Sequence, residues 1–210
     1  MKKLGFMTLL LAIALMLGGN AFATGLGGDF NYYFTTYYSN ANTANAPDAT
    51  VRIINDGYTT GVLGSVNLWA DIYVFDDSEE LTECCSCMVT ADGLLSESEN
   101  KNLTANPITD IKPTRGVIKV IASAFPGAST DWNGQIGAAG TGIALAYGLH
   151  GWATHVQKLT SGFAVSETPF ANSNLTLGPT GEQGLLENLC LFDGMLSGKP
   201  CTCTPEDQDF

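Results

Sequence analysis

Apolar and polar side chains alternate along part of this chain with the period of two that is typical of half-buried β-strands. Segment 66–75 has the clearest pattern, because its even positions are aliphatic and its odd positions are aromatic or polar. Since the side chains of a strand point alternately to opposite faces, we expect the even face, Val66 to Val74, to lie in the core. Further strands are predicted where β-branched, aromatic or alternating residues gather, at 30–38, 50–55, 116–122 and 143–156.

Two details of this pattern remain open. Gly151 predicts a bulge within 143–156, and a helix is the alternative for that segment. The polar segment 96–105 predicts no more than a helical turn before Pro107, because the residue preceding a proline avoids the helical region. Turn signals lie at Asn55–Gly57 and at Asp92–Gly93.

The end of the chain changes to a helical period. Leu185, Leu186, Leu189 and Cys190 recur at helical spacing, and Thr180 with Gln183 has the spacing of a capping box. Gly198 and Pro200 are typical of a helix end. We therefore predict a mainly β, antiparallel sandwich-like domain over 50–204 with one C-terminal helix, linked by disulfide bonds. An aromatic segment and a low-complexity linker precede it at 24–49, and an acidic tail follows at 205–210.

The first 23 residues have the layout of a secretory signal peptide. Basic Lys2 and Lys3 precede an apolar run, and Ala21–Phe22–Ala23 places small residues where a signal peptidase reads them. We expect cleavage after Ala23 and a secreted or periplasmic protein. The mature chain would then hold seven basic and 21 acidic residues, a net charge of −14. This charge argues against nucleic acid and anionic lipid as partners, and no mature segment is apolar enough to predict a membrane span.

Six cysteines occur in two sets, one in the middle of the chain and one at its end. An even number of cysteines in an exported chain predicts disulfide bonds. Pairs within a set strain the geometry of the bond, so the expected bonds join the two sets and fasten the C-terminal helix and tail to a sheet edge. Metal binding and redox exchange are the alternatives. The cysteines concerned are Cys84, Cys85, Cys87, Cys190, Cys201 and Cys203.

No motif predicts a catalytic residue, a metal site or a cofactor. His150 and His155 point to opposite faces if their segment is a strand, and no nucleophile motif accompanies them. The acidic run 76–80 with Glu83 lacks the ladder of a calcium loop, so we interpret it as a solvated turn. An extracellular hydrolase using carboxylates that no motif identifies remains an alternative function.

The odd face of 66–75 is the candidate binding surface. Trp69, Asp71, Tyr73 and Phe75 combine flat rings with a carboxylate, a combination that binds sugars or aromatic side chains of proteins. The alternative is that this face is a second buried face beneath the C-terminal helix. The aromatic segment 30–38 leaves a similar choice, because it either pairs inside its own sheet or inserts into another copy of the chain.

Several of these segments resemble a group of secreted bacterial proteins. The likeness rests on 67–76, on the Glu-Cys-Cys-x-Cys element at Glu83–Cys87 and on the closing Cys201–Thr202–Cys203. Trp69 stands where cysteine is common in that group. The resemblance implies export and a framework of cysteines, and it implies no activity. We therefore expect an exported, non-catalytic structural or surface-interaction protein that self-associates through its N-terminal strand, with a glycan- or protein-binding module as the alternative.

Overall fold

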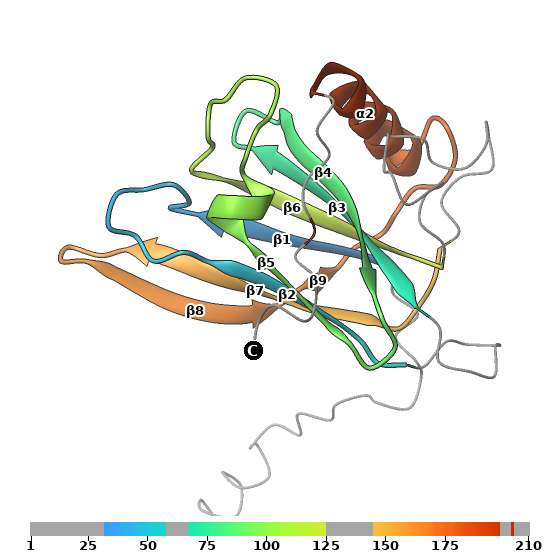
Figure 1. The fold of residues 1–210 in the computed structure, drawn as a ribbon, viewed down its shortest axis with the longest axis horizontal. Helices are drawn as coiled ribbons and strands as arrows, with labels where there is room; N and C mark the ends of the chain where they lie inside the picture. Colours follow the sequence, from blue (N-terminus) through green and yellow to red (C-terminus); the bar gives the residue numbers. More distant parts are fainter. Residues whose placement is uncertain (1–31, 58–66, 125–144, 198–202, 204–210) are drawn as a thin grey trace, which may run out of the picture. The chain divides into compact units, whose positions relative to one another are not determined.

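The computed structural model describes residues 32–57, 67–124, 145–197 and 203 (Figure 1). The predicted signal peptide, Cys201 and the acidic tail lie outside these residues. The described elements, in chain order, are β1 (Tyr33–Ser39), β2 (Thr50–Asn55), β3 (Leu68–Asp76), β4 (Leu81–Val89), β5 (Leu94–Ser98), the π-helical turn η1 (Glu99–Leu103), β6 (Arg115–Ser123), β7 (Leu149–Lys158), β8 (Phe163–Pro169), β9 (Ala171–Asn172) and α2 (Glu182–Ser197).

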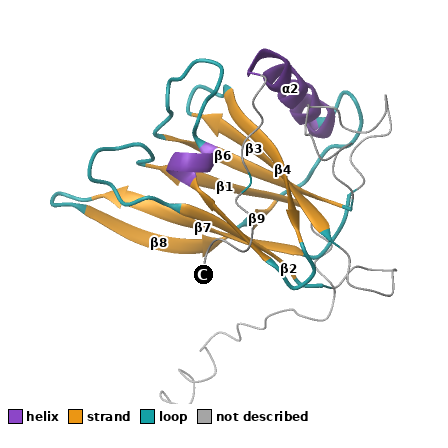
Figure 2. Ribbon diagram, viewed as in Figure 1, coloured by secondary structure: helices purple, strands orange, loops and turns teal. Residues whose placement is uncertain are grey.

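The strands form two antiparallel sheets (Figure 2). One sheet has the order β4-β3-β6-β1-β9, and the other has the order β5-β2-β7-β8. A shared hydrophobic core takes side chains from both sheets, and α2 follows the last strand. The predicted fold class, mainly antiparallel β with one C-terminal helix and disulfide bonds, is confirmed.

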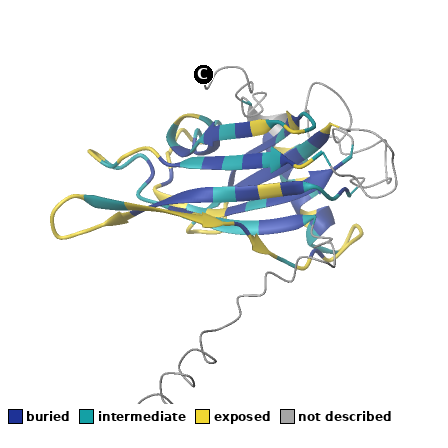
Figure 3. Ribbon diagram, turned by 90° about the horizontal axis from the view of Figure 1, so that it is seen from below, coloured by how far each residue is buried: buried dark blue, intermediate teal, exposed yellow. Residues whose placement is uncertain are grey.

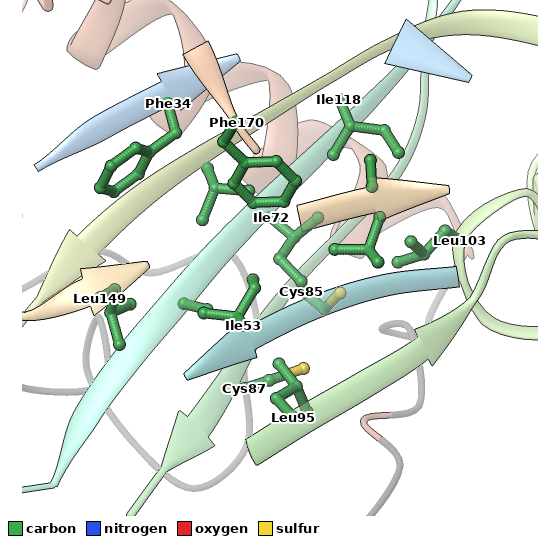
Figure 4. Packing of buried hydrophobic residues seen from close by; sticks show 14 of the residues in the cluster. Phe34, Ile53, Ile72, Cys85, Cys87, Leu95, Leu103, Ile118, Leu149 and Phe170 are labelled. Carbon is green, nitrogen blue, oxygen red and sulfur yellow. The ribbon is translucent and has the colours of Figure 1, made fainter. Parts of the chain in front are cut away.

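The aliphatic face of β3 lies in this core, as its alternation predicts. Its four described members, from Leu68 to Val74, are at most 1% exposed. Ile72 of β3 and Ile53 of β2 come from opposite sheets and lie in the same cluster of side chains (Figure 4). Burying such side chains supplies the main driving force for joining the two sheets.

The N-terminal aromatic segment belongs to the interior of its own sheet. All seven residues of β1 pair with β6, from Tyr33 opposite Ile121 to Ser39 opposite Arg115. The other side of β1 pairs with β9 at Phe34 and Thr35. The expected strand therefore forms, and it pairs with two other strands of its own chain.

Four details differ from the expectations. Gly151 lies in β7 opposite Ile53 without any shift of register, so the predicted bulge is wrong. The predicted capping box is also wrong, because the N–H of Gln183 donates to Thr176 O and the side-chain oxygen of Gln183 accepts from the N–H of Gly178. The segment 96–105 contains the end of β5 before its helical turn, and β8 and β9 form where no strand is predicted.

Close packing against Phe170 explains the glycine at position 151. A Cβ atom built there would lie 2.1 Å from Cε2 of the Phe170 ring. We expect Gly151→Ala to lower the free energy of unfolding by about 1–3 kcal/mol, as overpacking of a core does. Urea denaturation would measure the loss. The matched control is Ser166→Ala on the exposed neighbouring strand, where we expect a change within about 0.5 kcal/mol. Equal stabilities of the two variants would contradict this packing role.

Candidate functional site

The cysteines of β4 face both sides of the sheet, because neighbouring residues of a strand point in opposite directions. Cys84 lies in the cluster beneath α2, and Cys87 lies in the core between the sheets. Cys84 is bonded to Cys190 of α2, Cys87 is bonded to Cys203, and Cys85 is also disulfide-bonded. The predicted links between the middle and the end of the chain are confirmed for these two pairs. Their sulfur atoms are therefore not available as thiolate ligands for a metal.

The odd face of β3 lies beneath α2. Asp71 and Tyr73 have no exposed surface, and Trp69 and Phe75 are half-buried. Tyr73 packs in a cluster with Leu186 of α2. The centre of this face, Asp71 and Tyr73, is therefore buried and forms no open surface, whereas Trp69 and Phe75 stay partly accessible.

Asp71 is the most enclosed carboxyl group of this contact. Ser86 Oγ donates a hydrogen bond to Asp71 Oδ1 over 2.5 Å, and Asp71 Oδ2 has no hydrogen-bond partner. Burial raises the pKa of Asp71 to about 7, although hydrogen bonds from Ser86 and Ser123 act in the opposite direction. Glu187 on α2 adds a smaller repulsive contribution. Because an isolated charge is costly in a buried site, Asp71 is stable there chiefly as the neutral acid.

Asp193 and Glu83 are two further carboxyl groups that are almost completely buried. Asp193 Oδ2 lies 3.7 Å from Cys84 Sγ, so this acid adjoins the disulfide bond between β4 and α2. Burial raises the pKa of Asp193 to about 6. Burial, and then repulsion by Asp193, raise the pKa of Glu83 to about 8. One carboxyl oxygen of each side chain is buried without a hydrogen-bond partner.

Among the described residues, Lys119 is the cation at the contact between α2 and the sheet, and it is already paired. Lys119 Nζ on β6 lies 2.5 Å from Glu182 Oε1, and Tyr33 Oη donates to the same oxygen over 2.7 Å. Burial alone would raise the pKa of Glu182, but the hydrogen bonds from Lys119 and Tyr33 lower it. Lys119 therefore neutralises Glu182 rather than Asp71, Glu83 or Asp193.

A further buried acid lies away from α2, in η1. Glu99 is 1% exposed, and neither of its carboxyl oxygens has a hydrogen-bond partner. Burial, and then repulsion by Asp48, raise the pKa of Glu99 to about 8. Buried acids are thus a general property of the described domain, and those beneath α2 are its densest group.

The histidines and the exposed acids have structural surroundings. His150 is exposed beside Asp56, whereas His155 is buried and stacks on Tyr37, so the two point to opposite faces of β7 as predicted. In the acidic run, Asp76 Oδ1 accepts backbone hydrogen bonds from Ser78 and Glu80. The turn at 77–80 is solvent-exposed, which agrees with its interpretation from the sequence, but Glu83 is buried and does not belong to it.

Sequence reasoning missed the role of Asp193, although a signal was present. Asp193 follows Cys190 by three residues and Leu186 by seven, which places all three on one helical face. An acidic residue that continues an apolar stripe predicts either a functional group or a protonated one. Glu83 offers no such signal, since its burial depends on how β4 packs.

Comparisons of the chain with known protein families, with curated proteins and with solved structures found no match. Within the described residues, no helix combines the length and the apolar composition needed to cross a membrane.

Proposed function

We propose that this chain is an extracytoplasmic, non-catalytic structural or surface-interaction protein that associates with a second copy of itself through the free edge of β8. Export is supported by the signal-like start of the sequence and by the disulfide bonds, which persist in oxidising compartments. The observation that carries self-association is an exposed edge strand in a domain whose N-terminal strand is already paired.

β8 is an edge strand with little cover. It ends the order of the four-stranded sheet, and its last five residues, Val165 to Pro169, are exposed. Figure 3 shows this exposure along β8 and at the turn that joins it to β7, whereas much of β7 is buried. A long edge strand without bulges or inward charges offers its unpaired N–H and C=O groups to another strand. Its register with β7 runs without a shift from Lys158 opposite Phe163 to Trp152 opposite Pro169.

Two hydrogen bonds show which backbone groups of this strand face outward. Leu159 N–H donates to Gly162 O, and Phe170 N–H donates to Gly151 O. Because the bonding direction alternates along an antiparallel strand, even-numbered residues of β8 bond to β7 and odd-numbered residues bond outward. The outward N–H groups belong to Phe163, Val165 and Glu167.

The charges on β8 itself are compatible with a second copy of the chain as the occupant. The chain has a net charge of −12, yet β8 carries one acid, Glu167, which forms an ion pair of 2.9 Å with Arg52. An antiparallel pair of β8 strands with its twofold axis at Val165 would place Phe163 opposite Glu167, so no like charges would face each other directly. Such a pair is isologous and closes as a dimer.

The edges of the other sheet are less regular. The register of β4 shifts opposite Val74 and Phe75, both faces of β4 carry disulfide bonds, and β9 contains two residues. Short strands and bulges are the usual means of avoiding unwanted pairing. The lack of such protection at β8 supports its use as an interface.

Val165→Pro tests this function, because proline removes an outward N–H and leaves the bonds to β7 in place. We expect the protein from residue 24 to be a dimer by light scattering, and Val165→Pro to weaken the dimer at least about tenfold. Val165→Thr, which keeps the N–H group and the shape, is the matched control and should dimerise normally. A wild-type monomer at about 100 µM, or equal dissociation constants for the proline variant and the wild type, would refute the proposal.

A further inference from the structure

We propose that α2 is a pH-gated cover of the five-stranded sheet, closed in acidic solution and loosened as the pH rises, which uncovers an aromatic and apolar surface while the Cys84–Cys190 bond keeps the helix attached. This proposal does not depend on the β8 interface, since it concerns the other sheet. It rests on the enclosure of Asp71 and Asp193 between the helix and the strands, where no cation of the described residues pairs with them.

The contact between α2 and the sheet combines an apolar cluster with buried acids. Leu186 and Cys190 of α2 are fully buried in the cluster that they share with the sheet. Asp193 continues the same helical face and is 4% exposed. The sheet residues of this cluster, which an opened helix would uncover, are Tyr33, Tyr73, Leu81, Cys84 and Ile121.

Negative charge predominates among the groups on both sides of the contact. β6 contributes Lys119, which is paired with Glu182 of α2. Glu187 of α2 accepts a hydrogen bond from Gln183, and its negative charge raises the pKa of Asp71. The phenols of Tyr33 and Tyr73 stay neutral, because burial raises the pKa of each well above its usual value. Among the described residues, no cation pairs with Asp71 of β3 or Asp193 of α2, whereas Glu83 of β4 lies opposite Val74 and so faces the other side of the sheet.

These acids couple closure of the helix to protonation. In the closed state the pKa of Asp193 is about 6 and that of Asp71 is about 7, mainly because of burial. When the helix lifts, water reaches the carboxyl groups and their pKa values return toward those of ordinary acids. The open state therefore releases protons that the closed state holds, so rising pH favours opening.

The disulfide bond limits the size of the movement. Cys190 lies in the middle of α2 and is bonded to Cys84 on β4, so the helix stays attached to the sheet when its weaker contacts are lost. The opening that we infer is consequently local and reversible, and it leaves the shared core between the two sheets intact. Local opening of this kind occurs below the free energy of global unfolding.

Hydrogen exchange measured by mass spectrometry on the disulfide-bonded protein tests this proposal. Between about pH 5.5 and about pH 8.5 we expect the protection factors of α2 amides, corrected for intrinsic exchange, to fall at least about tenfold. The amides of β6, in the centre of the sheet, should keep their protection and thereby report on global unfolding. Unchanged protection of α2, or an equal loss in α2 and β6, would overturn the proposal.

Neutral variants separate the proposed gating from simple fraying of the helix. Asp193→Asn combined with Asp71→Asn removes two of the charges at nearly constant shape, and we expect it to reduce the pH dependence of α2 protection to less than about twofold. Asp193→Asn alone is the second variant, with a partial effect, should the double variant fold poorly. Glu79→Gln, on the exposed turn, is the matched control and should behave as the wild type. Full pH dependence in both Asp193 variants would refute the role of the carboxyl groups.

Discussion

The free energy of unfolding is expected to decrease as the pH rises from about 4 to about 8. Asp71 carries the best-defined part of this effect, since burial raises its pKa from 3.8 to about 7. Between these two values the unfolded chain has lost the proton that the folded chain still holds, so each step in pH favours unfolding. One unit of pKa corresponds to about 1.4 kcal/mol, which makes the contribution of Asp71 about 4 kcal/mol.

Other buried acids act in the same direction. Glu83 and Glu99 have pKa values raised to about 8, and that of Asp193 is raised to about 6. The stability that these groups provide is complete below about pH 4 and is lost as the pH rises through their folded-state pKa values. Glu182 acts in the opposite direction, because its pKa is lowered by Lys119 and Tyr33. Its effect is small, since the pair is partly exposed and one ion pair of this kind contributes about 1 kcal/mol or less.

Urea denaturation at a series of pH values measures this linkage. We expect the wild type to lose several kcal/mol between about pH 4.5 and about pH 8, an unusual direction for a protein rich in acidic residues. Asp71→Asn should remove a large part of the slope, whereas Glu79→Gln should leave it unchanged. A stability that increases over this range would show that the buried carboxyl groups have counter-ions in solution.

Removal of the bond between β4 and α2 is the second large expected effect. The bond joins residues 106 positions apart, but the Cys87–Cys203 bond already closes a similar loop. With that bond kept, the additional loop runs along β4 from Cys84 to Cys87 and along the C-terminal segment from Cys190 to Cys203. The chain-entropy relation gives about 3 kcal/mol for a loop of about 15 residues.

We therefore expect Cys84→Ala with Cys190→Ala to lower the free energy of unfolding by about 3 kcal/mol in urea denaturation. Alanine is the appropriate replacement, because a serine hydroxyl at position 84 would lie beside Asp193 and introduce a new hydrogen-bond donor there. The matched control, Cys87→Ala with Cys203→Ala, removes the bond on the other face of β4 and should leave α2 attached. A loss of less than about 1 kcal/mol in the first variant would mean that packing and neutral carboxyl groups hold the helix without covalent help.

Local patterns in the sequence determine much of this fold. The aliphatic residues of β3 alternate, and one face of a strand with that pattern is buried whatever lies opposite. Leu186 and Cys190 recur at helical spacing, which defines the buried side of α2. The two sets of cysteines likewise predict a link between the middle and the end of the chain, because pairing within a set is strained.

Long-range packing decides the remaining features. β8 has no alternation that predicts a strand, since both of its faces are largely exposed, and it forms because β7 lies beside it. Gly151 leaves room for the ring of Phe170, a residue that follows β8 in the chain. It does not mark a local bulge. From the sequence, the odd face of β3 is equally suited to contact with solvent or with a helix. In the structure α2, which is distant in sequence, packs against it.

The charge state of the acids shows most clearly which features the sequence determines and which the tertiary structure decides. The sequence by itself determines how many carboxyl groups the chain carries and that its net charge is −12. Only the tertiary structure decides that Asp71, Glu83 and Asp193 are enclosed with no cation from the described residues beside them, and so which carboxyl groups hold protons near neutral pH. The physical reason is that the cost of an ion depends on the water and charges around it in space, which local sequence does not encode.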